Sequence, residues 1–151
     1  MEYRRKEGPK VTDITQIYCA GYKRLGPGGK AVFRARCKEL LKNGDLYFSD
    51  LNELVFYAKS LELYWQYDQI VKEKGEVLDY EDRMGNTRYY PNPAVKMCRD
   101  ALNDLMAIGA HFGFQPLSRK KLAMAADDSE DPVEALLKMV TNDRSRARKD
   151  S

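Results

Sequence analysis

"SDLNELVFYAKSLELYWQYDQIVKEKG", residues 49–75, decides the fold because apolar side chains cover most of its circumference at helical spacing. Ser49 can cap a helix over 49–74, and Gly75 suits the position that ends it. A helix that is apolar on several sides needs more cover than one neighbouring helix supplies, so the stretch also predicts contacts with another copy of the chain. Its polar residues form one narrow stripe, made up of Asn52, Lys59, Glu62, Gln66, Gln69 and Glu73.

A second long helix is predicted over 93–112. Asn92-Pro93 is typical of an N-cap followed by a proline in the first turn, and Gly113 suits the helix end. Between the two long helices, apolar and aromatic residues surround Met84-Gly85-Asn86, which predicts a short β-hairpin over 76–90. The predicted fold class is therefore mainly all-α: a long antiparallel helical hairpin with a short β-hairpin insertion.

Shorter flanking helices are predicted over 30–42, from an apolar stripe, and over 118–126, with Ser118 as the cap. Residues 30–126 then form a helical core. Outside it we expect a flexible basic arm over 1–29, an acidic linker with a short helix over 127–140, and a disordered basic tail over 141–151. "GPGGK", residues 26–30, is interpreted as a hinge or linker, because Arg24 and Ala31 stand where a phosphate-binding loop requires Gly and Ser or Thr.

The charge balance permits a nucleic-acid partner without requiring one. There are 26 Lys and Arg residues against 23 Asp and Glu residues, a formal net charge of +3. On the helix over 30–42, four basic residues recur every four positions and can present several cations to a phosphate backbone, although a solvated polar surface is the alternative interpretation. The candidate DNA-binding residues are Lys30, Arg34, Lys38 and Lys42, with Lys23, Arg24, Arg119, Lys120 and Lys121.

Nothing in the sequence indicates catalysis or a metal site. His111 is the only histidine, and no Ser or Cys motif places a nucleophile near it. Cys19, Cys37 and Cys98 are widely spaced without a CxxC pair, which argues against a zinc site or a disulfide framework and favours a reducing cytoplasm. No apolar run is long enough to span a bilayer. We expect a non-enzymatic protein without catalytic residues, cofactor, metal or membrane partner.

Two longer stretches carry a family resemblance. They are "LLKNGDLYFSDLNELVFYAKSLELYWQYDQIVKEKG", residues 40–75, and "NPAVKMCRDALNDLMAIGAHFGFQPLSRKKL", residues 92–122. With the hairpin between them, residues 30–122 resemble the P27 family of bacteriophage terminase small subunits. The most specific parts are Asn92-Pro93 and the closing "FGFQPLSR" of residues 112–119, where Phe114 and Gln115 replace the family's common leucine and threonine.

The resemblance implies a non-enzymatic component of the phage genome-packaging motor, acting in the host bacterial cytoplasm. Such a subunit binds viral double-stranded DNA, assembles into a homo-oligomeric ring of about eight to ten chains and regulates the terminase large subunit. The alternatives are a protein-docking adaptor without DNA binding and a helix-turn-helix regulator that binds DNA as a dimer. The candidate ring-forming residues are Leu54, Tyr57, Leu61, Tyr64, Trp65, Leu102, Leu105 and Phe112.

Overall fold

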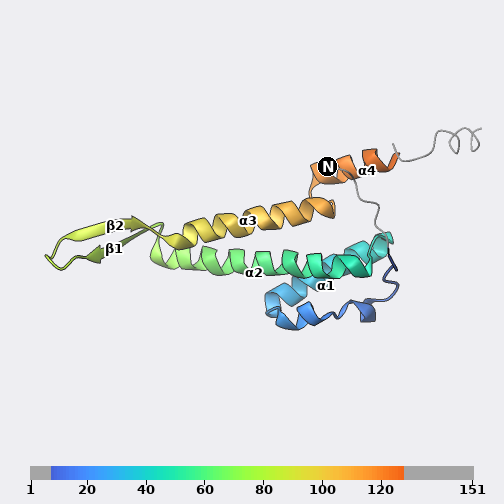
Figure 1. Cartoon of the computed structure of the whole chain (residues 1–151), viewed down its shortest axis with the longest axis horizontal. Coiled ribbons are helices and arrows are strands. Elements are labelled where there is room, and N and C mark those ends of the chain that lie inside the picture. The colour runs from blue at the N-terminus through green and yellow to red at the C-terminus, as the bar shows by residue number, and fades with distance from the viewer. Residues whose placement is uncertain (1–7, 128–151) are drawn as a thin grey trace, which may run out of the picture. The chain divides into compact units, whose positions relative to one another are not determined.

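The computed structural model describes residues 8–127, and these are mainly helical with one two-stranded antiparallel sheet (Figure 1). The predicted fold class is confirmed. The α-helices are α1 (Pro27–Asn43), α2 (Leu51–Lys74), α3 (Pro93–His111) and α4 (Pro116–Asp127). The strands are β1 (Val77–Glu81) and β2 (Thr87–Pro91), and three short 3-10 helices are η1 (Ile14–Ile17), η2 (Ala20–Arg24) and η3 (Phe48–Asp50).

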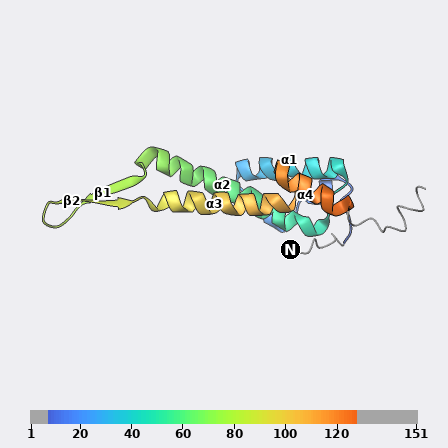
Figure 2. The ribbon, with the colours of Figure 1, turned by 90° about the horizontal axis from the view of Figure 1, so that it is seen from above.

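The described residues fall into two compact units, 8–111 and 112–127. In the first unit, α2 and α3 lie antiparallel and side by side, and the β1–β2 hairpin joins them at one end (Figures 1 and 2). Helix α1 packs against the first half of α2. The second unit contains α4. The predicted linker, short helix and tail lie outside the described residues from position 128 onward.

Asn92 holds the hairpin base and the two long helices together. Its side-chain amide donates to the Gly75 carbonyl oxygen (2.7 Å), and its Oδ1 accepts the Ala94 N–H (3.0 Å). The predicted N-cap is thus confirmed, and the same side chain also bonds the residue that ends α2. Small buried residues on α3, namely Ala94, Ala101 and Gly109, allow the helix to approach α2 closely.

The largest fully buried side chains all come from the first part of the chain. They are Phe33, Ile17, Leu46, Leu54 and Cys37. In the second half of α2, by contrast, Trp65 and Ile70 are exposed, and no residue beyond Glu62 is buried. The hydrophobic core therefore lies where α1, η1 and the start of α2 meet. The far half of the α2–α3 pair, which is the half next to the hairpin, buries little apolar surface by itself.

The segment expected to be a flexible arm is folded over residues 8–29. It contains η1 and η2, and Val11, Ile17 and Leu25 are buried. Asp13 caps η1 by accepting the Thr15 N–H (2.7 Å), while the backbone of Val11 bonds to that of Leu46. Helices of four and five residues are too short to show a periodic apolar pattern, so the sequence pattern missed them.

Three helix starts differ from the prediction. Helix α1 begins at Pro27, because proline suits a first helical position. A 3-10 turn, η3, precedes α2, where the Asp50 carboxylate accepts the Tyr47 N–H (3.2 Å), so Ser49 is not the cap. Helix α4 begins at Pro116, which places Ser118 inside its first turn.

The Gly-Pro-Gly-Gly stretch, residues 26–29, is the docked N-terminus of α1 and not a hinge. The Gly29 N–H donates to Glu62 Oε1 on α2 (2.8 Å). A Cβ atom at Gly26 or Gly29 would stand 2.6 Å from Glu62, and one at Gly28 would stand 3.1 Å from the Trp65 ring. Glycine is therefore needed for close approach: the backbone of α1 lies directly against two side chains of α2.

Glu62 is a buried carboxylate, with 7% of its surface exposed. Burial by itself would raise the pKa of the Glu62 carboxyl group, but hydrogen bonds from the Gly29 and Gly26 backbone lower it. The Lys59 ammonium group, 3.3 Å away, lowers the pKa of Glu62 further, so the net shift is downward. The first N–H groups of a helix carry partial positive charge, which explains how an ionised carboxylate is tolerated here.

The contact between Gly29 and Glu62 predicts a change of sign in a double-mutant cycle. Gly29→Ala should lower the free energy of unfolding by about 1–3 kcal/mol, because its methyl group displaces the Glu62 carboxylate. In a Glu62→Ala background the same change should be neutral or stabilising by up to about 1 kcal/mol, because alanine favours a helix over glycine. Urea unfolding followed by circular dichroism at one protein concentration measures both; equal destabilisation in the two backgrounds would contradict the contact.

Candidate nucleic-acid interface

The basic residues of α1 lie away from the side that packs on the core. Gly29, Phe33, Cys37 and Leu40 form the buried side. At about 100° per residue, Lys30 lies at the edge of that side, and each later basic residue turns further from it, until Lys42 lies almost opposite. Burial agrees, because Lys30 is half-buried and the other three are exposed.

Lys30 is fixed against an aromatic ring. Its Nζ lies 5.7 Å from the centroid of the Tyr22 ring in η2, and that ring packs against Phe33 at 5.5 Å. A cation over an aromatic face is attracted by the ring quadrupole. Lys30 therefore presents its charge from a defined position where η2 meets the start of α1.

Arg34, Lys38 and Lys42 form a row of exposed cations along α1. Within residues 8–127, none of the three makes an ion pair or a side-chain hydrogen bond. Successive members of the row are about 6 Å apart along the helix axis, from four residues at about 1.5 Å each. We call Lys30, Arg34, Lys38 and Lys42 the α1 basic face.

Arg36 shows that not every cation of α1 belongs to this face. It pairs with Glu39 (2.7 Å), and its guanidinium group lies over the Tyr57 ring of α2 at 5.8 Å. Its charge is thus engaged within the chain. This contrast separates a structural arginine from the exposed row.

Further cations lie at both ends of α1. Lys23 and Arg24 are exposed in the last turn of η2, and Arg24 lines a hollow of about 480 Å³ with Phe56 and Lys59. At the other end, Lys10 donates to the Gly44 carbonyl oxygen (2.9 Å), where a cation is favoured by the helix dipole. The sequence prediction missed Lys10, because the prediction treated its segment as unfolded.

Arg119, Lys120 and Lys121 belong to the second unit. All three are exposed on α4. Arg119 Nε donates to the Gly113 carbonyl oxygen (3.2 Å), and Gly113 has the positive φ, 65°, that the turn before α4 requires. Arg119 thus closes this turn, while Lys120 and Lys121 stay candidates on charge alone.

The eight candidate ring-forming residues divide by exposure. Leu54, Tyr57 and Phe112 are buried within the chain, which leaves little of their surface for a neighbouring copy. Leu61, Tyr64 and Leu105 are half-buried. Trp65 and Leu102 remain exposed, at 46% and 40%. Only part of the predicted set is therefore available for assembly.

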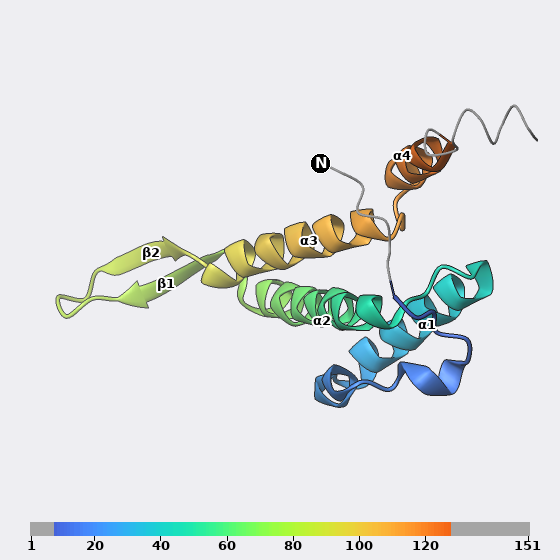
Figure 3. The ribbon, with the colours of Figure 1, turned by 45° about the vertical axis from the view of Figure 1, so that its right-hand side comes forward.

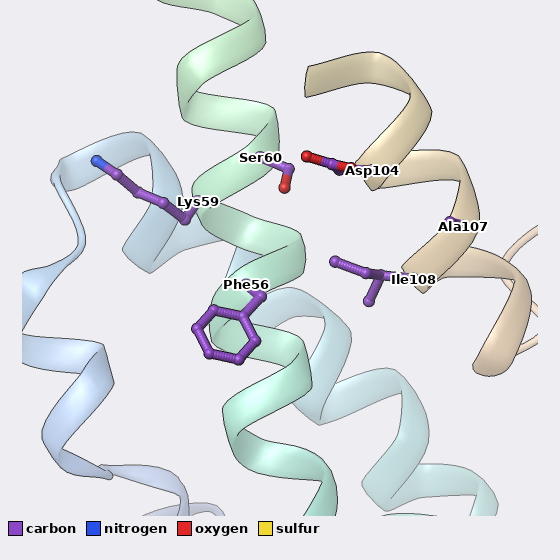
Figure 4. Close-up of a pocket in the computed structure, with 6 residues that line it drawn as sticks. All are labelled: Phe56, Lys59, Ser60, Asp104, Ala107 and Ile108. Carbon is purple, nitrogen blue, oxygen red and sulfur yellow. The ribbon is translucent and has the colours of Figure 1, made fainter. Parts of the chain in front are cut away.

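Other exposed apolar residues on the same helix pair were not predicted. Phe56 is 61% exposed, Ile70 36%, Met97 47% and Met106 49%. Phe56 borders a groove of about 360 Å³ between α2 and α3, which Lys59, Ser60, Asp104, Ala107 and Ile108 also line (Figure 4). No sequence signal separates Phe56 from its buried neighbours, because buried Tyr57 is followed by Tyr64 and Val71 at the same seven-residue spacing.

Within 8–127, no three His, Cys, Asp or Glu side chains cluster as a metal site would require. His111 Nδ1 lies 3.8 Å from Glu53 Oε2, a contact between α3 and α2 at the surface. None of the helices described here has the length and apolar character needed to cross a bilayer.

Comparison with known proteins gives one match. A family model described as phage terminase, small subunit, matches residues 29–129. No curated protein and no solved structure matches the chain. The matched region contains the α1 basic face, the α2–α3 pair, the hairpin and α4. The resemblance seen in the sequence is confirmed at this level, and the narrower P27 grouping stays a prediction.

Proposed function

Because that match spans well over half of the sequence, the chain belongs to the phage terminase small-subunit family, and we propose that it binds viral double-stranded DNA through the α1 basic face. We further propose that it assembles into a ring and regulates the terminase large subunit in the host bacterial cytoplasm. The family supports the packaging role.

The row of exposed, unpaired cations at Arg34, Lys38 and Lys42 carries the DNA proposal. Phosphate contacts need positive groups and give affinity without reading sequence. The row lies on a helix whose start is fixed to α2 by Glu62, so little ordering is required when DNA binds. Lys30, Lys23 and Arg24 extend the positive charge beyond the row.

The α2–α3 pair supports the assembly proposal. Its far half buries few large side chains and exposes Trp65 and Ile70, while Phe56, Leu102 and Met106 are exposed elsewhere along the pair. Exposed apolar surface of this kind marks interaction sites, and a closed symmetric assembly covers it in every copy. A ring would also add the weak phosphate contacts of many copies by avidity.

Neutralising the α1 row should weaken DNA binding far more than neutralising three cations elsewhere. The triple variant Arg34→Gln, Lys38→Gln and Lys42→Gln should bind a duplex about ten-fold more weakly or worse. It should also lower the salt slope of log K by about 0.9 per lost contact. Fluorescence anisotropy across a salt series measures both quantities.

The matched control is Lys74→Gln, Lys96→Gln and Arg99→Gln, which removes the same charge from exposed positions on α2 and α3. It should bind nearly as the unmodified protein does. Equal losses in the two triple variants would show that net charge alone sets affinity. No binding by the unmodified protein at low salt would favour the protein-docking adaptor.

The assembly proposal predicts one closed species of about eight to ten chains in native mass spectra at near-physiological salt. Phe56→Asp should shift the protein to smaller species, because it places a charge on an exposed apolar stripe without disturbing the core. Leu117→Asp, a control on α4 where Leu117 is 66% exposed, should leave assembly unchanged. A simple dimer of the unmodified protein would favour the helix-turn-helix regulator.

A further inference from the structure

The β1–β2 hairpin is the least covered element of the first unit. It projects beyond the ends of α2 and α3 (Figures 1 and 3). Val77 is 58% exposed, Tyr80 54% and Tyr89 74%, and only Leu78 among the strand residues is half-buried. A two-stranded hairpin is marginally stable in water, and exposed apolar side chains on both of its faces mark an interaction surface.

The turn of the hairpin is nonetheless firmly built. The Asp82 carboxylate accepts the N–H groups of Met84 and Asn86, both at 2.9 Å, and pairs with Arg88 at 3.2 Å. These hydrogen bonds, that of Asn86 first, lower the pKa of Asp82. Gly85 supplies the positive φ, 80°, of the turn. The projecting strands are therefore held in register before any partner arrives.

Both edges of the hairpin carry free backbone groups. Hydrogen bonds join Asn92 to Glu76 and Asp82 to Asn86, so the even-numbered residues between them form the bonded pairs of the ladder. The N–H groups of Val77, Asp79 and Glu81 then point outward from β1, and those of Thr87 and Tyr89 point outward from β2. Pro91, which has no N–H, also lies at an outward position. Such edges are templates for pairing with another strand.

The charges of the hairpin indicate which strand fits. Residues 76–91 carry four carboxylates against two guanidinium groups, unlike the chain as a whole, which disfavours nucleic acid as the partner. Strand β1 carries Asp79 and Glu81, whereas Arg88 is the only charged residue of β2. Pairing β1 with another β1 would place carboxylates opposite each other, whereas pairing β2 with β1 so that Thr87 lies beside Glu81 places Asp79 and Glu81 opposite the uncharged Tyr89 and Thr87.

From this geometry we propose that β2 of one copy pairs edge to edge with β1 of the next copy, forming a continuous sheet between subunits. The two strands run antiparallel within one hairpin, so a head-to-tail arrangement keeps the new pair antiparallel as well. The same contact then repeats around a closed ring. This inference rests on the proposed ring assembly and adds which strand edges join its subunits.

Blocking one outward N–H tests the inference. Tyr89→Pro removes an N–H of the β2 edge, whereas the bonds between β1 and β2 do not use that group. The matched control, Tyr89→Val, loses the same exposed aromatic ring but keeps the N–H. In native mass spectra, Tyr89→Pro should lose the closed species and Tyr89→Val should keep it, with unchanged helical circular dichroism for both.

The outcomes separate this inference from the proposed function. If the unmodified protein does not assemble, the ring proposal fails together with the edge pairing. If it assembles and Tyr89→Pro assembles equally well, only the edge pairing is overturned. The inference is equally overturned if Tyr89→Pro assembles normally but no longer binds the large subunit, since the edge would then belong to that partner.

Cross-linking tests the polarity of the pairing. A mixture of a Glu81→Cys protein and a Thr87→Cys protein should form mixed disulfides between copies, because these residues end β1 and begin β2 at the same height. Peptide mass spectrometry identifies the joined positions. Predominant pairing of Cys at 81 with Cys at 81, or no disulfide in the assembled protein, would overturn the head-to-tail arrangement.

Discussion

The position of the α1 N-terminus on α2 depends on one buried carboxylate, that of Glu62. Two N–H groups of that terminus and the ammonium group of Lys59 compensate its burial. The contact requires glycine at positions 26 and 29, because a side chain at either would occupy the space of the carboxylate. This contact holds the N-terminus of α1, the helix that carries the exposed cations, against α2.

The long elements could be predicted from the sequence because their signals are local. The apolar periodicity of α2 and α3, the turn residues of the hairpin and the Asn92 cap each lie within a few positions of the structure that they specify. Glu62 gave no such signal. On a helical wheel it belongs to the polar stripe of α2, and only contact with residues 33 positions earlier in the chain makes it a buried cap.

Around the candidate site, too, the features that the sequence patterns missed depend on contacts between distant parts of the chain. Exposure could not be read from helix patterning where α2 is apolar on several sides, so buried Leu54 and exposed Phe56 looked alike. The fold of residues 8–29 depends on single contacts such as that between Val11 and Leu46, which leave no periodic trace. Charge spacing, in contrast, did predict a connected row of cations on α1, because residues four apart are neighbours on the surface of any helix.

The proposed functions use surfaces of different chemistry. A row of exposed cations lies on α1, large exposed apolar side chains lie on α2 and α3, and the hairpin is acidic with free strand edges. The side chains that anchor the core lie before the far half of α2, so that half and the hairpin hold little stabilising burial of their own. Contacts with other copies would supply this burial, which couples stability to protein concentration. Because those surfaces do not include the α1 basic face, assembly and DNA binding would not compete for the same residues.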